Sequence, residues 1–92
     1  MRIKVAKRNG LKEPLDEGKL WDSLYHPAKE AHYPEKEAVE LADEVKHSLM
    51  DWMHSHDDNV FTTREIAERA EELLEERDDQ VAVMYNRHLD IN

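Results

Sequence analysis

An Asn-Gly pair at positions 9 and 10 constrains the fold of this chain more than any other feature. Asn-Gly is a strong β-turn signal, and the run 2–7 before it alternates cationic and apolar side chains as a strand does. A two-residue loop would place Leu15 on the wrong face, whereas a three-residue loop with Gly10 left-handed aligns the apolar odd-numbered residues. We therefore predict a β-hairpin over residues 2–15. Its expected pairs are Ile3 with Leu15, Val5 with Glu13 and Lys7 with Leu11.

Apolar residues at helical spacing fill the rest of the chain. We predict four helices, over residues 16–31, 34–55, 63–77 and 79–90. Asp16 is a good N-cap for the first helix, and Thr62 with Glu65 has the capping-box pattern before the third. Pro27 removes a backbone donor, so the first helix is either kinked or ends near residues 25–26 and resumes to Ala31. The predicted fold is a single α+β domain, mostly α, with the hairpin capping a four-helix bundle.

Length and composition exclude several classes of function. A chain of 92 residues is one domain, too small for both a core and a roomy enclosed active site. It has no cysteine, which excludes disulfides, thiolate metal sites and cysteine nucleophiles. No apolar run approaches the roughly 18 residues of a membrane span, and no signal-peptide core follows Met1, so we expect a cytoplasmic protein without a membrane partner. No catalytic constellation is visible, and we do not expect an enzyme.

Charge is distributed unevenly along the chain. The net charge is −9, but residues 1–20 hold six Lys/Arg against three Asp/Glu, so this segment is +3 and the remainder is −12. The total argues against a nucleic-acid partner, whereas an anionic ligand would be drawn to the N-terminal segment. Lys7 and Arg8 lie at the hairpin tip, and Lys19 lies in the first turn of a helix whose dipole also favours anions. This pattern predicts an anion site where the hairpin meets the first helix.

Histidines on the second predicted helix offer a different site. His47, Asp51 and His54 recur at i, i+4 and i+7, with His56 and residues 57–58 just beyond, so they could bind a divalent metal. Loosely spaced surface histidines are commoner than metal sites. We therefore do not assign a metal site.

Two stretches resemble a known family. Val5-Ala6-Lys7-Arg8-Asn9-Gly10, followed by Glu13-Pro14-Leu15-Asp16-x-x-Lys19-Leu20, resembles the opening of an ATP-cone domain. That module is found at the N-terminus of many ribonucleotide reductases and in the repressor of their genes. The far end is similar as well, through residues 62–68 and 79–85. The repressor version needs a cysteine zinc ribbon, which this chain lacks.

The resemblance implies a regulatory module that binds ATP or dATP with Mg²⁺. Its site residues would be Lys7, Arg8 and Lys19 on the phosphates, Glu13 and Asp16 near the nucleoside, Asn9 in the hairpin loop and Thr63 near the base. Glu13 could accept hydrogen bonds from sugar hydroxyls or hold the magnesium ion through water. A protein partner such as a ribonucleotide reductase or a regulator would be reached in trans, or the chain would form a homo-oligomer. The alternative is a cone whose pocket has decayed and that serves only as an interaction module.

Overall fold

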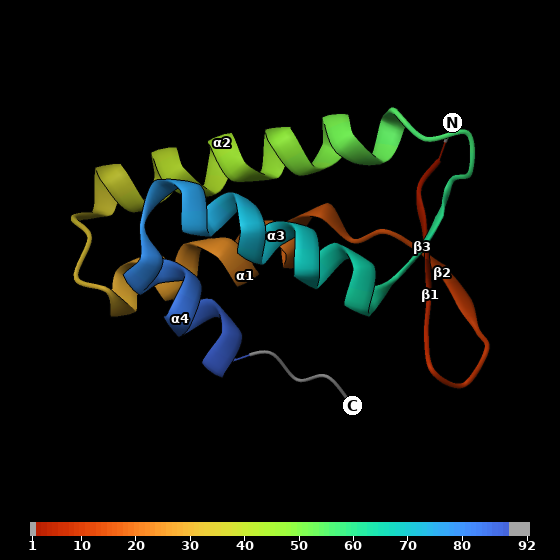
Figure 1. Ribbon diagram of the computed structural model, residues 1–92, viewed down its shortest axis with the longest axis horizontal. Helices are drawn as coiled ribbons and strands as arrows, with labels where there is room; N and C mark the ends of the chain where they lie inside the picture. Colours follow the sequence, from red (N-terminus) through yellow and green to blue (C-terminus); the bar gives the residue numbers. More distant parts are fainter. Residues whose placement is uncertain (1, 89–92) are drawn as a thin grey trace.

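The computed structural model describes residues 2–88 and has a small sheet at one end of a set of packed helices (Figure 1). The elements in chain order are β1 (Lys4–Ala6), β2 (Lys12–Pro14), α1 (Glu17–Glu30), α2 (Glu35–His54), β3 (Val60–Thr62), α3 (Thr63–Arg77) and α4 (Asp79–Arg87). The α+β class with mostly helical content is thereby confirmed. None of the described helices is long and apolar enough to cross a membrane.

The hairpin has the register predicted from its apolar pattern. Val5 pairs with Glu13 across β1 and β2, and the Lys7 amide donates to the Leu11 carbonyl at 2.8 Å. Gly10 has a φ of +85°, the left-handed conformation that closes a three-residue loop. Ile3 is buried, and Val5 and Leu15 pack against the core. The apolar face of the hairpin thus contacts the helices.

The sequence does not predict β3, which pairs in parallel with β1. The strand order is β2-β1-β3, so β1 is the central strand of a three-stranded sheet rather than half of an isolated hairpin. A strand of three residues is too short to show an alternating pattern, and its partner lies more than fifty residues away. Asn59 strengthens the connection, because its carbonyl accepts from the Lys4 amide at 2.8 Å and its side chain donates to the Arg2 carbonyl at 2.7 Å.

Side-chain caps begin three of the four described helices, α1, α3 and α4, whereas α2 starts after Pro34 without a side-chain cap. Asp16 accepts a hydrogen bond from the Lys19 amide at 3.1 Å, which caps α1. Thr62 and Glu65 form a complete capping box at α3, with bonds of 3.0 and 2.8 Å. Asp78 ends α3 and caps α4. Within the described residues α4 ends at Arg87 rather than at the predicted residue 90, and positions 89–90 lie outside the described residues.

Pro27 lies inside a single α-helix, Glu17–Glu30. The expectation that the first helix could end near residues 25–26 is therefore wrong. Proline removes one backbone donor, the one that would reach the carbonyl of Ser23, but the remaining hydrogen bonds and the burial of this face maintain the helix. The uninterrupted helix carries Leu24 and Ala28, on either side of Pro27 in the sequence, into the core.

One hydrophobic core joins the helices to the sheet. Helix α1 packs on α2 and α4, and α3 packs on α2 and α4. The largest fully buried side chains come from all four helices and are Leu24, Leu49, Met53, Leu74, Val45 and Val81. Phe61 of β3 is also buried, and its ring lies 5.4 Å from that of Trp52, between centroids. This contact attaches the parallel strand to the end of α2.

Candidate functional site

The parallel pairing of β1 and β3 brings two of the predicted site residues to one edge of the sheet. Ala6 pairs with Thr62 at the end of the ladder. Lys7 and Thr63 follow this pair, and both strands of a parallel pair end at the same edge. Thr63 is also the first residue of α3, so its backbone lies at the positive end of a helix dipole. The hairpin and the start of α3 thus meet at a point that favours negative charge.

Lys7 does not stand alone at this edge. Its Nζ lies 3.0 Å from Oε2 of Glu13, and the two side chains are 52% and 50% exposed. The hairpin register explains the contact, because Val5 is opposite Glu13 and Lys7 is therefore its diagonal neighbour on the same face. Two residues predicted to bind different parts of one ligand are bound to each other in this structure.

Arg8 and Asn9 occupy the hairpin loop. The side-chain oxygen of Asn9 accepts a hydrogen bond from the Leu11 amide at 3.1 Å, and the Gly10 amide donates to the Lys7 carbonyl at 2.9 Å. Asn9 therefore shapes the turn, which leaves its side-chain NH₂ group for a ligand. Arg8 is exposed, and the described residues provide it with no ion-pair partner.

Asp16 and Lys19 lie at the start of α1, directly after the hairpin. The Leu15 amide donates to the Ile3 carbonyl at 3.0 Å, so the helix begins at the base of the sheet. One oxygen of Asp16 caps the helix, while the Lys19 side chain is exposed. Glu17, the acid in the first turn, is paired with Lys46 of α2 at 3.1 Å. That pairing reduces the repulsion that an incoming anion would meet at this helix end.

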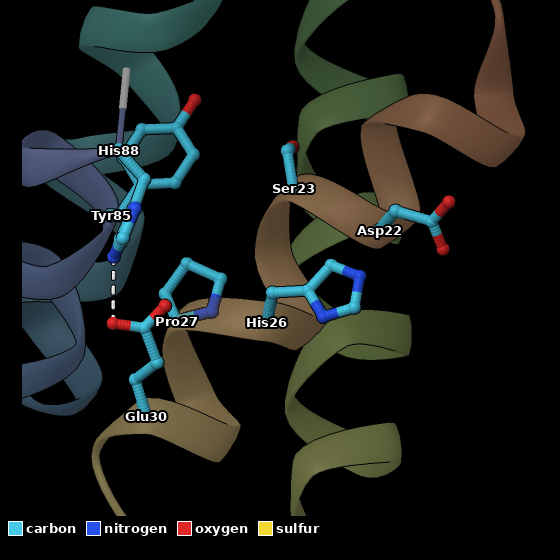
Figure 2. Close-up of a pocket in the computed structure, with 7 residues that line it drawn as sticks. All are labelled: Asp22, Ser23, His26, Pro27, Glu30, Tyr85 and His88. Carbon is cyan, nitrogen blue, oxygen red and sulfur yellow. Dashed lines mark hydrogen bonds and ion pairs between the residues drawn. The ribbon is translucent and has the colours of Figure 1, made fainter.

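A cavity of about 380 Å³ lies elsewhere, between α1 and α4 (Figure 2). None of the predicted site residues lines it; its walls are Asp22, Ser23, His26, Pro27, Glu30, Tyr85 and His88. At one end His88 Nε2 lies 2.6 Å from Glu30 Oε2, which joins the two helices. These residues were not predicted from the sequence to form a site. The spacing of residues 22, 26 and 30 at four-residue intervals is the signal that could have placed them on one helix face.

Tyr85 forms the buried wall of this cavity. Burial, and secondly the negative charge of Glu71, raise the pKa of its hydroxyl to about 12. The phenol is therefore neutral at physiological pH and can donate a hydrogen bond. In Figure 2 its hydroxyl lies at the opposite end of the ring from the His88–Glu30 contact.

The histidines of α2 do not gather into a metal site. His47 Nε2 lies 3.3 Å from Asp51 Oδ2, and both side chains are largely exposed. Within residues 2–88 no group of three or more His, Cys, Asp or Glu side chains is placed to hold a metal ion. His56 instead contacts the backbone carbonyl of Trp52 through Nδ1 at 2.7 Å. The spacing thus produces one exposed contact between His47 and Asp51, and His56 makes a contact at the helix end.

Comparison with known protein families supports the resemblance of both ends of the chain to an ATP-cone domain. The family model for the ATP cone domain matches residues 3–88, which is nearly the whole chain. The match covers the hairpin, all four helices and the predicted site residues together. No match to this chain was found among curated proteins.

Proposed function

The chain belongs to the ATP cone domain family, and we propose that it binds ATP or dATP where the hairpin meets the starts of α1 and α3. Members of this family are regulatory domains that bind these nucleotides, so nucleotide binding and allosteric regulation follow from membership. We further propose that the bound nucleotide changes how the chain associates with a partner in trans or with itself. A cytoplasmic ribonucleotide reductase or a regulator of one would be that partner.

The observation that carries the proposal is the sheet edge at which Lys7 and Thr63 follow the Ala6–Thr62 pair. Lys7 matches a phosphate-binding position of the family and Thr63 a position near the base. The parallel pairing draws together the two parts of the chain that hold these residues. A ligand at this edge would therefore contact both the hairpin and α3.

Charge supports the same location. The segment 1–20 carries +3 within a chain of −9, so it alone attracts a polyanion. Arg8 and Lys19 are exposed and have no carboxylate partner among the described residues, so they are available to phosphates. Charge-assisted hydrogen bonds from such groups are the strong ones in phosphate recognition. The three cations Lys7, Arg8 and Lys19 are the proposed phosphate ligands.

Magnesium would enter with the nucleotide. The described part of the chain has no cluster of three ligands that could hold a metal ion by itself. Mg²⁺ commonly binds through substrate phosphates, waters and one or two carboxylates. Glu13, whose carboxylate is half exposed beside Lys7, is the residue that could reach such an ion through water.

Calorimetric titration with ATP, dATP and ADP in the presence of magnesium tests the proposal. We expect saturable heat with ATP or dATP and a rise in the melting temperature, because a ligand that binds only the folded state stabilises it. The absence of both heat and a thermal shift at millimolar nucleotide would overturn it. Light scattering with and without nucleotide then tests self-association.

A second function, an interaction module with a decayed pocket, is favoured by one observation. Four predicted ligand groups already have partners: Asn9 in the turn, Asp16 in the helix cap, and Lys7 and Glu13 in their ion pair. Residues with such internal partners could be retained because they stabilise the fold, without binding a nucleotide. The same titration separates the two functions, because only the first produces heat with nucleotide.

A further inference from the structure

Glu13 and Lys7 form the one contact in which a proposed phosphate ligand is bound to an acidic side chain of the described chain. The distance between Nζ and Oε2 is 3.0 Å. The backbone fixes both residues, since the Lys7 amide and carbonyl bond to Leu11 and Gly10 and Glu13 lies in the β1–β2 ladder. The pair is therefore built into the register of the hairpin and forms without any ligand.

The other two proposed phosphate ligands differ from Lys7. Arg8 and Lys19 have no ion-pair partner within residues 2–88. The nearby acids have other partners: Asp16 accepts the capping hydrogen bond of α1, and Glu17 forms an ion pair with Lys46. Lys7 alone must exchange a carboxylate for a phosphate when an anion arrives.

We propose that Glu13 acts as an intramolecular competitor that holds Lys7 in the empty state and releases it to the phosphates of the nucleotide. This inference rests on the proposed function. Release would leave the Glu13 carboxylate without its cation and free to accept hydrogen bonds from the nucleoside. Glu13 would thereby weaken the binding of every polyphosphate by competing for Lys7. It would recover part of that loss only for a polyphosphate that carries a nucleoside.

The size of the effect follows from the exposure of the pair. Ion pairs between side chains that are about half exposed contribute little, typically 0.2–1 kcal/mol. At about 1.4 kcal/mol per factor of ten, this corresponds to roughly a 1.5-fold to fivefold change in affinity. Competition of this size tunes a binding constant without blocking the site.

Inorganic tripolyphosphate separates the two roles, because it has phosphates and no nucleoside. Glu13→Gln removes the competitor, so we expect it to bind tripolyphosphate about 1.5- to fivefold more tightly than the unchanged protein does. ATP should gain less, or should bind more weakly, because the variant also loses the carboxylate proposed to accept hydrogen bonds from the nucleoside. The ratio of the ATP and tripolyphosphate affinities should fall in either case.

Glu17→Gln is the matched control. It removes the same charge from the same end of the molecule and breaks another exposed ion pair, Lys46–Glu17, but it frees no proposed phosphate ligand. Calorimetry in one buffer, with both ligands and all three proteins, gives the comparison. Thermal unfolding of each protein checks that the hairpin change has not altered the fold.

The outcomes are distinguishable. A gain for tripolyphosphate in Glu13→Gln beyond that in Glu17→Gln, with a lower ATP preference, supports the competitor. Equal changes in the two variants show an effect of net charge alone and overturn it, as does weaker tripolyphosphate binding by Glu13→Gln. If the unchanged protein binds neither ATP nor dATP, the proposed function itself fails.

Discussion

Ala6 pairs with Thr62 across the parallel strands β1 and β3. This pair joins the hairpin to the capping box that starts α3, because Thr62 is both the last residue of the strand and the N-cap of the helix. A displacement of β1 would therefore act on the first turn of α3. The hairpin is better described as two adjacent strands of a three-stranded sheet, with β1 at its centre, than as a lid that moves by itself.

The connection extends through the helices. Helix α3 ends at Asp78, which caps α4 and also accepts a hydrogen bond from the Tyr33 hydroxyl at 2.6 Å. Tyr33 lies between α1 and α2, and Asp78 lies between α3 and α4, so this bond joins the ends of all four described helices far from the sheet. The proposed nucleotide site at one end of the molecule is thus connected to the α1–α4 cavity through continuous packed elements. Packing that is continuous in this way permits energetic coupling between the two ends of the molecule.

Replacing Lys7 or Lys19 by alanine should weaken ATP binding by at least about tenfold while the protein stays folded. Each variant loses a charge-assisted hydrogen bond, worth about 1.5–3 kcal/mol, from an exposed position that contributes little to stability. Calorimetry gives the affinity and circular dichroism the fold.

Lys12→Ala is the control for these two variants. Lys12 is opposite Ala6 in the hairpin ladder, so it projects from the face away from Lys7 while carrying the same charge. We expect its affinity for ATP to change by less than about twofold at physiological salt, where exposed charges are screened. An equal loss in all three variants would mean that the segment attracts nucleotide by its charge without specific contacts.

The capping box should be a principal determinant of stability near the site. Thr62→Ala removes the acceptor for the Glu65 amide and should lower the free energy of unfolding by about 1 kcal/mol. Thr63→Ala, one residue further on, should change it by less than about 0.5 kcal/mol, since no capping bond involves its side chain. Urea denaturation of both variants measures the difference. A larger cost for Thr63→Ala would show a structural role where we propose a ligand contact.

Local chemistry made most of the fold predictable. The position of Gly10 and the alternation of Ile3 and Val5 determined the hairpin register, and the caps at Asp16 and Thr62 determined two helix starts. The turn and the caps each involve four consecutive residues or fewer, and the alternating pattern involves one short strand. The hydrogen bonds and backbone preferences behind these signals are local, and tertiary contacts in the folded chain do not override them.

What escaped prediction depends on contacts between distant residues. Strand β3 forms because Phe61 packs on Trp52 and Asn59 bonds to Arg2. Neither contact produces a periodic pattern in the sequence. The α1–α4 cavity likewise combines Glu30 with His88, fifty-eight residues apart. The ligand roles of the hairpin residues came from the family resemblance, and they remain predictions.

Gly10 should be required for its conformation and not for its size. Its φ is +85°, and a Cβ built there would meet no atom within 4 Å. Gly10→Ala should therefore destabilise the protein by about 1–2 kcal/mol through backbone strain alone. Gly10→Asn should cost less, because asparagine adopts the left-handed region more readily. Equal costs for the two variants, measured by urea denaturation, would contradict this explanation.

The Tyr33–Asp78 hydrogen bond should make stability depend on pH in both directions. The bond from Tyr33 is the main cause that lowers the pKa of the Asp78 carboxyl, and the same bond, aided by burial and the negative charge of Asp78, raises the pKa of Tyr33 to about 12. A lowered carboxyl pKa contributes stability that is present above its unfolded value, near 4, and is lost as the pH falls through the folded value. A raised phenol pKa contributes stability that is present below about 10 and is lost as the pH rises toward 12.

Tyr33→Phe tests both the low-pH and the high-pH prediction with one substitution. It removes the hydroxyl, so it should cost about 1 kcal/mol at pH 7 and shift the Asp78 pKa, followed by carboxyl NMR, upward. The difference in stability between the two proteins should shrink below pH 4 and again above pH 10. Tyr85, whose pKa is also raised to about 12, is present in both proteins, so its contribution cancels in the difference. A difference that stays constant from pH 3 to pH 11 would show that Tyr33 acts through packing and not through its bond to Asp78.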